Sequence, residues 1–282
     1  MASKQNDMVR YYFGRLNLVY SRNNTSKSQL LWNSLKSSIF YEKRNYRWGF
    51  FEVDKIQING FEFFCGYLVK YQKEGIEAIV NENSKTLEET KINLKRKGQC
   101  LFALDPITGI IIYNNSGSNI SVSLFNNIFC ELLEEANERF FFNAEITAIN
   151  DDFSIEKILD DFDYITKLSF VLHPSNPSNR DAWKKTDEKI RNINAEQYYE
   201  EYRRKSDNKG LKIEKGSEPY NNILMAIDGY GVAHFYGRKD GKIKRKSTKK
   251  EPKSVYAPKD SKEDMITSVF DAYKSIISRF NQ

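Results

Sequence analysis

The densest group of chemically active side chains is cationic and lies between Arg238 and Lys253. This sixteen-residue segment holds nine lysines and arginines against two acidic residues, Asp240 and Glu251. Nine minus two is seven, so the segment alone accounts for the formal net charge of +6 of the whole chain. The cations are Arg238, Lys239, Lys242, Lys244, Arg245, Lys246, Lys249, Lys250 and Lys253.

A segment of this kind can bind phosphate groups. Gly237 and Gly241 would let the backbone approach a phosphate, and Ser247 and Thr248 can donate hydrogen bonds to it. Because such contacts release counterions, binding would weaken steeply with salt and would not depend on base sequence. The alternative is a solvated ribbon whose lysines serve solubility. The density of cations favours nucleic-acid contact, and duplex DNA is the partner that we expect.

A second cationic group, which contains Arg203 and Arg204, is expected at the end of a charged helix. Positive charge there also complements the helix dipole, which is the alternative explanation. If the upstream residues Arg180, Lys184 and Lys185 lie on the same face as the basic segment, the groups would form one binding surface.

The chain from residue 131 to 163 is acidic and offers carboxylates for a different chemistry. Pairs such as Asp151-Asp152 could chelate magnesium in a nuclease, although carboxylates adjacent in sequence seldom converge on one ion. The Glu-x-Lys pattern of many nucleases occurs at Glu89–Lys91 and Glu251–Lys253, and neither lies on an expected strand. We therefore name no catalytic residue.

The sequence shows no pattern of histidine or cysteine residues that is typical of a catalytic or metal site. Cys65, Cys100 and Cys130 are odd in number and lie among apolar neighbours, which is typical of reduced core residues. His173 and His234 lack a second ligand at metal-binding spacing, so no metal is expected. His173 could contact a ligand, but its Pro-Ser-rich segment is equally explained as a turn. Phosphate-binding glycine motifs and nucleophile motifs are absent from the sequence, and no cofactor is expected.

Apolar stretches are short throughout the chain. The longest is broken at Asp105 and Pro106 and falls below the ~20 residues of a membrane helix. The N-terminus has no apolar core typical of a secretion signal. We expect a cytoplasmic protein.

Hairpins are the clearest structural signal in the N-terminal half. Two strand-like runs, Arg47–Ile58 and Phe61–Tyr71, meet at Asn59-Gly60, which is the strongest short hairpin signal. A second hairpin is expected to turn at Asp105–Gly109. The other expected elements are a strand at Tyr11–Tyr20, a helix at Ser26–Phe40, a strand at Ile76–Val80, a helix at Leu87–Leu94, a helix capped by Ser118 or Ser121, and a strand at Phe140–Ile149.

In the C-terminal half, the basic segment is expected to continue a meander of short strands. Strands at Asn222–Ile227 and Val232–Tyr236 would flank the Asp228-Gly229 turn, and Lys242–Arg245 would add a third strand after Lys239-Asp240-Gly241. The other expected elements are a helix at Ser154–Leu159, a strand at Tyr164–Leu172, a charged helix at Asp181–Lys205 and a terminal amphipathic helix at Lys262–Phe280.

These elements predict an α+β fold of two mixed domains, residues 1–150 and 151–282, with antiparallel hairpins and a C-terminal amphipathic helix. The boundary is expected within the acidic stretch.

The order of these elements also carries a family resemblance. It rests on the early hairpin (Gly49–Val69), a mid-chain apolar pair (Phe102–Tyr113), a strand before a Pro-Ser loop (Leu168–Ser178), and the basic meander before a terminal helix. This layout resembles the RexA-like phage-exclusion proteins and, more loosely, the DNA-binding subunit KwaB of the Kiwa anti-phage system. The resemblance implies a two-domain homodimer that binds duplex DNA with little sequence preference and acts in abortive defence against phage. It implies no catalytic residues.

Two other hypotheses stay open. In the first, the terminal helix and the basic surface dock onto an acidic protein partner, such as a membrane component encoded alongside. In the second, the acidic stretch belongs to a metal-dependent nuclease.

Overall fold

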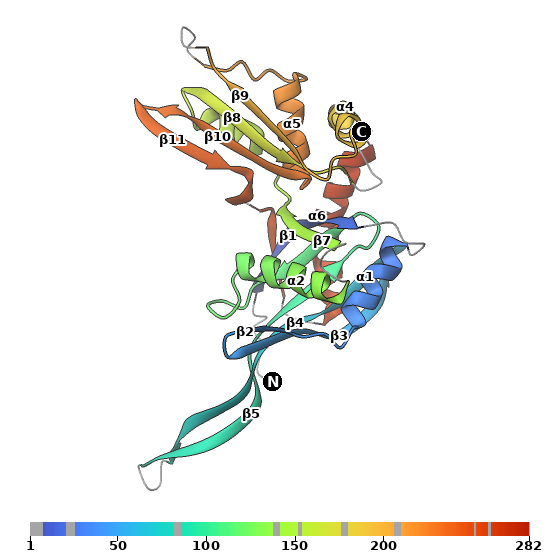
Figure 1. Cartoon of the computed structure of the whole chain (residues 1–282), viewed down its shortest axis with the longest axis vertical. Coiled ribbons are helices and arrows are strands. Elements are labelled where there is room, and N and C mark those ends of the chain that lie inside the picture. Colours follow the sequence, from blue (N-terminus) through green and yellow to red (C-terminus); the bar gives the residue numbers. More distant parts are fainter. Residues whose placement is uncertain are drawn as a thin grey trace, which may run out of the picture.

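The computed structural model describes residues 8–20, 26–81, 86–137, 142–151, 154–175, 180–205, 210–250, 252–258 and 261–281. These residues form two antiparallel sheets with helices packed on them, which confirms the expected α+β class. In Figure 1 the smaller sheet lies at one end of the molecule, and the larger sheet extends toward the other end.

The larger sheet has eight strands in the order β12-β1-β6-β5-β4-β3-β2, with β7 also paired to β1. The strands are β1 (Met8–Tyr20), β2 (Tyr41–Lys43), β3 (Tyr46–Ile58), β4 (Phe61–Asn81), β5 (Thr86–Leu104), β6 (Ile110–Asn114), β7 (Phe142–Ala148) and β12 (Ser254–Pro258).

Both expected hairpins are confirmed. The turn between β3 and β4 places Asn59 at φ 51° and Gly60 at φ 84°, the left-handed region that an Asn-Gly turn requires. In the β5–β6 turn, Asp105 Oδ1 accepts a hydrogen bond from the Ile107 amide at 2.8 Å. Gly109 ends that turn with a φ of 76°.

The expected helix at Leu87–Leu94 is wrong, because this segment is part of strand β5. The β4–β5 ladder continues from Glu74 opposite Asn93 to Asn81 opposite Thr86, beyond the last pair of β3 with β4. Figure 1 shows this stretch as a two-stranded arm that leaves the sheet. The two β-branched residues of the segment, Thr90 and Ile92, favour extended backbone.

Helices cover the larger sheet on both faces. Helices α1 (Lys27–Lys36) and α2 (Val122–Ala136) pack on the face that carries Phe64 and Phe102. Helix α6 (Lys262–Ile277) packs on the face that carries Phe63. Neighbouring residues of a strand point to opposite faces, so the alternation of buried residues along β4 and β5 follows from this arrangement. The expected terminal helix is confirmed, and its apolar side is buried against the sheet.

The smaller sheet has four strands in the order β11-β10-β8-β9. These are β8 (Tyr164–Leu172), β9 (Tyr198–Arg203), β10 (Gly231–Lys239) and β11 (Lys242–Ser247). Helices α3 (Ser154–Asp160), α4 (Lys184–Asn192) and α5 (Glu218–Ile227) pack on one of its faces. That face contributes Leu168, Phe170 and Phe235 to the core, so the alternate residues point to the other face.

Two predictions in this half are wrong. The charged segment from residue 181 to 205 is not one helix, because α4 ends at Asn192 and the chain turns through Asn194 at φ 52° into strand β9. Aromatic residues in that strand favour pairing with β8. The segment Asn222–Ile227 is helical rather than extended, since Pro219 in the first turn sets the helical φ and Ile223 and Ile227 share a buried side.

The two sheets are joined through the backbone and through a buried charge network. The Asn150 amide donates to the Ile227 carbonyl at 2.9 Å, and the Lys253 amide to the Ile149 carbonyl at 2.7 Å. Strand β12 and helix α6 then return to the larger sheet. The division into residues 1–150 and 151–282 stays a prediction. It would assign β12 and α6 to the second domain, although both pack on the larger sheet.

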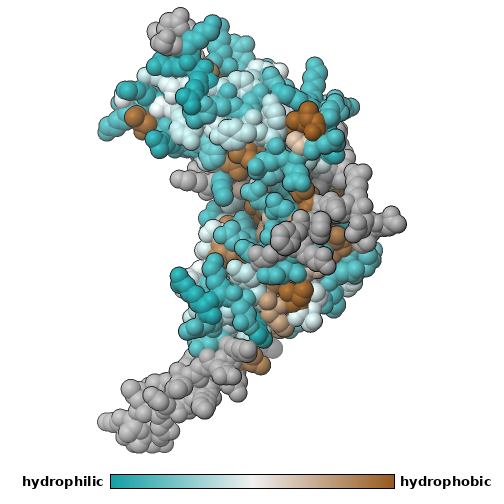
Figure 2. Space-filling model, in the orientation of Figure 1, coloured by the Kyte–Doolittle hydropathy of each residue, from teal (hydrophilic) through white to brown (hydrophobic). Residues whose placement is uncertain are grey.

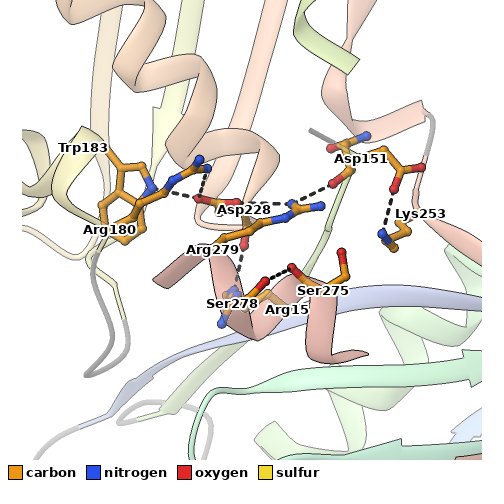
Figure 3. A network of polar contacts seen from close by, with 10 residues as sticks. Arg15, Asp151, Arg180, Trp183, Asp228, Lys253, Ser275, Ser278 and Arg279 are labelled. Atoms are coloured by element: carbon orange, nitrogen blue, oxygen red, sulfur yellow. Dashed lines mark hydrogen bonds and ion pairs between the residues drawn. The ribbon is translucent and has the colours of Figure 1, made fainter. Parts of the chain in front are cut away.

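The buried network centres on Asp228, at the end of α5 (Figure 3). Trp183 Nε1 donates to its Oδ2 at 2.9 Å, and Arg279 Nη1 lies 3.3 Å from its Oδ1. Arg180 Nη1 lies 3.7 Å from Oδ2. Arg15 Nε donates to the main-chain carbonyl of residue 228 at 2.7 Å. The fully buried Asp228 thus contacts Arg180, before α4, and Arg279, in the C-terminal η3 (Ser278–Asn281), through its carboxylate, and Arg15 of β1 through its main-chain carbonyl.

Candidate nucleic-acid interface

The basic segment forms the end of β10, strand β11, the short helix η2 (Thr248–Lys250) and the lead into β12. Asp240 and Gly241 make the turn between β10 and β11 with φ values of 50° and 72°, as expected for an Asp-Gly hairpin. Because side chains alternate along β11, Lys242, Lys244 and Lys246 point to one face and Arg245 to the other.

On the first of these faces, acidic residues neutralise several cations. Lys244 Nζ lies 2.7 Å from Asp161 Oδ1, and Lys246 forms an ion pair with the same carboxylate. Hydrogen bonds from these two lysines lower the pKa of Asp161 to about 2. Lys239 Nζ lies 3.5 Å from Asp163 Oδ1.

The same pairing occurs where the segment leaves the smaller sheet. Lys253 Nζ lies 2.8 Å from Asp151 Oδ1, and its side chain is 13% exposed. Three carboxylates of the acidic stretch, those of Asp151, Asp161 and Asp163, are therefore paired with lysines of the basic segment. No group of three or more potential metal ligands occurs among the residues that the structure describes.

The second face of the smaller sheet is cationic and aromatic, and helices α3, α4 and α5 lie on the opposite side. The strand register places four residues in one row across it, because Arg245 pairs with Tyr236, Tyr236 with Lys167, and Lys167 with Arg203. We call this surface the open face. Its residues are Tyr164, Lys167, Ser169, Val171, Tyr199, Glu201, Arg203, Val232, His234, Tyr236, Arg238, Ile243, Arg245 and Ser247.

The charges of the open face are only partly compensated. Glu201 Oε2 accepts from Lys167 at 2.6 Å, and Arg203 forms an ion pair with the same carboxylate. Both contacts lower the pKa of Glu201. The Arg203 side chain nevertheless stays 72% exposed. Four cations against one carboxylate leave a net charge of +3 on this face.

Cations also lie over the tyrosine rings of the open face. Lys167 Nζ is 5.2 Å and Arg245 Cζ is 5.7 Å from the ring centroid of Tyr236. Arg204 Cζ, just beyond β9, is 5.7 Å from the centroid of Tyr164. These distances fall within the range of cation–π attraction.

Large apolar surface is exposed at two corners of the open face. Tyr199 is 65% exposed and Ile243 is 73% exposed. Otherwise the surface around the smaller sheet is mostly hydrophilic in the view of Figure 2. Burial lowers the pKa of His234, and the charge of Lys249 adds to the effect. The lowered pKa favours the neutral form of this imidazole.

The structure thus brings together Arg203, Arg204, Arg238 and Arg245, which the sequence placed in two separate groups. The helix-dipole explanation for Arg203 and Arg204 is wrong, since Arg203 ends strand β9 and Arg204 directly follows it.

The remaining predicted cations lie elsewhere. Lys242 is exposed at the hairpin end, and Lys249 is exposed beside a groove that runs along α2. The side chain of Lys250 lies outside the described residues. Lys184 and Lys185 start α4, which packs on the opposite side of the sheet. The hypothesis that they share one binding surface with the open face is therefore wrong. The predicted cations that pair with aspartates are Lys239, Lys244, Lys246 and Lys253.

Sequence reasoning missed Lys167, Tyr164, Tyr236 and His234 as members of the surface. The available signal was alternation in β8 and β10, where polar or aromatic residues alternate with Leu168, Phe170 and Phe235 of the core. Which side such residues face, and whether helices cover it, depends on packing.

Two concave regions lie outside the open face. A groove of about 1220 Å³ runs beside α2 and is lined by both charge signs, including Arg10, Lys157, Glu131 and Asp151. A cavity of about 130 Å³ contains His173, whose Nε2 lies 3.0 Å from Glu145 Oε2. Hydrogen bonding from this imidazole lowers the pKa of Glu145.

Taken together, the fold and this surface define a two-sheet α+β protein with a cationic, aromatic sheet face. Residues 9–278 match the model of the family described as domain of unknown function DUF4747, and the chain belongs to that family. None of the curated proteins compared with the chain matches it. No described helix is long and apolar enough to cross a membrane.

Proposed function

We propose that this protein binds nucleic acid through the open face, by contacts to phosphates and without reading base sequence. The observation that carries the proposal is the row of Arg245, Lys167 and Arg203 around Tyr236, with Arg238 alongside. Strands lie about 4.8 Å apart, so this four-strand row spans roughly 14 Å of cationic surface. Duplex DNA, the partner expected from the sequence, is the first ligand to test.

The paired lysines on the helical side contribute less in this proposal. Lys239 already pairs with Asp163, and Lys244 and Lys246 share the carboxylate of Asp161. About four phosphate contacts on the open face would give a slope near −3.6 for the logarithm of the binding constant against the logarithm of salt concentration. Binding would then weaken by more than 100-fold between 50 and 200 mM salt, as roughly follows from that slope.

The test uses a fluorescein-labelled 20-base-pair duplex and fluorescence anisotropy in a salt series. The double variant Arg203→Glu/Arg245→Glu reverses two charges on the open face. The matched control, Lys184→Glu/Lys185→Glu, reverses two exposed charges on α4, on the other side of the sheet. We expect the control to bind like wild type at 50 mM salt and the open-face variant to bind at least about 10-fold more weakly. Equal binding by both variants would refute the assignment.

We further propose, from the resemblance to phage-exclusion proteins, that this binding serves anti-phage defence in the cytoplasm, with the protein acting as a homodimer. Plaque counts on a bacterial host that expresses wild type or the open-face variant test the role. Protection that persists in a variant unable to bind nucleic acid would contradict it, and light scattering of the purified protein measures the oligomeric state.

The protein-docking hypothesis loses one of its two surfaces. The apolar side of α6, including Met265, Val269 and Tyr273, is buried in the core of the larger sheet. Only the basic surface is left for an acidic partner, and it is the surface that nucleic acid would occupy.

A further inference from the structure

Two tyrosine–cation pairs lie next to each other on the open face. Tyr236 carries Arg245 and Lys167 within 6 Å of its ring centroid, and Tyr164 carries Arg204. Tyr164 pairs with Arg238, two residues beyond Tyr236 on β10, so the two tyrosines are diagonal neighbours on adjacent strands. Such neighbours lie about 7 to 8 Å apart.

A β-bulge at this point sets the relation of the two rings. The register of β8 and β10 shifts between Tyr236 and Gly237. A Cβ at Gly237 would lie 2.3 Å from the Tyr164 carbonyl oxygen, so the close approach of the two strands requires glycine. The spacing of the tyrosine–cation pairs is therefore built into the strand geometry.

Pairs of an aromatic ring and a cation match the two parts of a nucleotide. An aromatic ring or a guanidinium plane stacks on a base, and the positive charge attracts the adjacent phosphate. The imidazole of His234 and the exposed ring of Tyr199 add further flat groups along the same face. Binding of phosphates requires only cations and does not explain the aromatic side chains of the open face.

Stacking of bases on aromatic side chains distinguishes single-stranded from duplex nucleic acid. In a duplex the bases are stacked on each other, and their faces are closed to a sheet surface. In a single strand the bases can turn outward and stack on aromatic side chains. The exposed apolar surface of Tyr199 and Ile243, at two corners of the face, would otherwise stay in water.

We propose that the open face binds single-stranded nucleic acid in preference to duplex, with bases stacked on Tyr236 and Tyr164 and phosphates held by Arg245, Lys167 and Arg204. This inference rests on the proposed function and names the form of nucleic acid that the surface takes.

The test compares three labelled ligands of 15 nucleotides by anisotropy at 50 mM salt: an oligothymidine strand, an abasic strand with the same phosphates, and a 15-base-pair duplex. The variants are Tyr236→Leu, which removes the ring, and Tyr236→Phe, which keeps it. The matched control is Tyr256→Leu, which removes an exposed tyrosine from β12 of the larger sheet. Urea unfolding of each variant confirms that it is folded.

We expect wild type to bind oligothymidine at least about 5-fold more tightly than the abasic strand and the duplex, and Tyr236→Leu to lose about 5- to 100-fold for oligothymidine only. Tyr236→Phe and Tyr256→Leu should bind like wild type. Equal affinity of wild type for oligothymidine and the abasic strand would overturn the stacking inference and leave phosphate binding intact. If no ligand binds at low salt, the proposed function itself fails.

Discussion

Removal of the buried carboxylate of Asp228 should destabilise the junction between the two sheets. Asp228 is fully buried, and Arg15 and Arg279, which contact residue 228, are 0% and 3% exposed. The Arg15 guanidinium also lies between rings, 4.3 Å from the Tyr230 centroid and 4.9 Å from that of Phe280. These arginines cannot reach water without separating the sheets.

The expected loss in free energy of unfolding depends on which contacts each variant removes. Asp228→Ala removes the acceptor of the Trp183 bond and the charge that faces Arg279, while the Arg15 bond to the main-chain carbonyl remains. Breaking a buried ion pair on one side costs about 3 to 5 kcal/mol in free energy of unfolding. Asp228→Asn keeps an acceptor for Trp183 and should lose about half as much, since neutral hydrogen bonds are roughly half as strong as charged ones.

Urea unfolding followed by circular dichroism at pH 7 measures both variants. The control is Glu218→Ala, which breaks a pair with Lys189 whose two side chains are 57% and 47% exposed. Such a pair contributes less than about 1 kcal/mol. A loss below about 1 kcal/mol for Asp228→Ala would show that the buried arginines do not depend on this carboxylate, and the reasoning would be refuted.

Three further predictions follow from other contacts. Asp161→Asn releases two lysines on the helical side, away from the open face, so the log–log salt slope of duplex binding should not change. A slope steeper by up to about 1.8 would show that these lysines reach DNA and would contradict the open-face assignment. The lowered pKa of Glu145 in the folded state means that its pair with His173 stabilises the protein above the ordinary pKa of 4.5 and loses this effect as the pH falls below it. Urea unfolding of wild type and His173→Gln from pH 3 to 6 should therefore converge at low pH, and a constant difference would contradict this. Gly237→Ala should cost about 1 to 3 kcal/mol in the same assay because its Cβ meets Tyr164 backbone, and a loss below about 0.5 kcal/mol would mean that the strands separate easily.

Local signals predicted many of the elements well. The hairpins at Asn59-Gly60 and Asp240-Gly241 were readable because each turn needs left-handed backbone that few residue types supply. Ser121, one of two expected caps, accepts a hydrogen bond from the Leu124 amide at 3.3 Å. Apolar residues at intervals of three and four predicted α6 correctly.

The failures occurred where local preference and packing disagree. The segment at Leu87–Leu94 is charged enough to suggest a helix, yet it pairs with β4 from Leu87 to Asn93. The segment Asn222–Ile227 has strand-like composition, yet it forms a helix that covers the smaller sheet. In both cases the secondary structure depends on packing against another element, which the local sequence pattern does not contain.

The sequence by itself determined that the chain carries a concentrated positive charge near its C-terminal end, because charge is a property of composition. Only the tertiary structure decided which cations are available. It paired Lys239, Lys244 and Lys246 with the acidic stretch, and it aligned Arg245 with Lys167 and Arg203 across four strands. Strand alternation and register set these relations, and register is fixed by long-range pairing that no local pattern encodes.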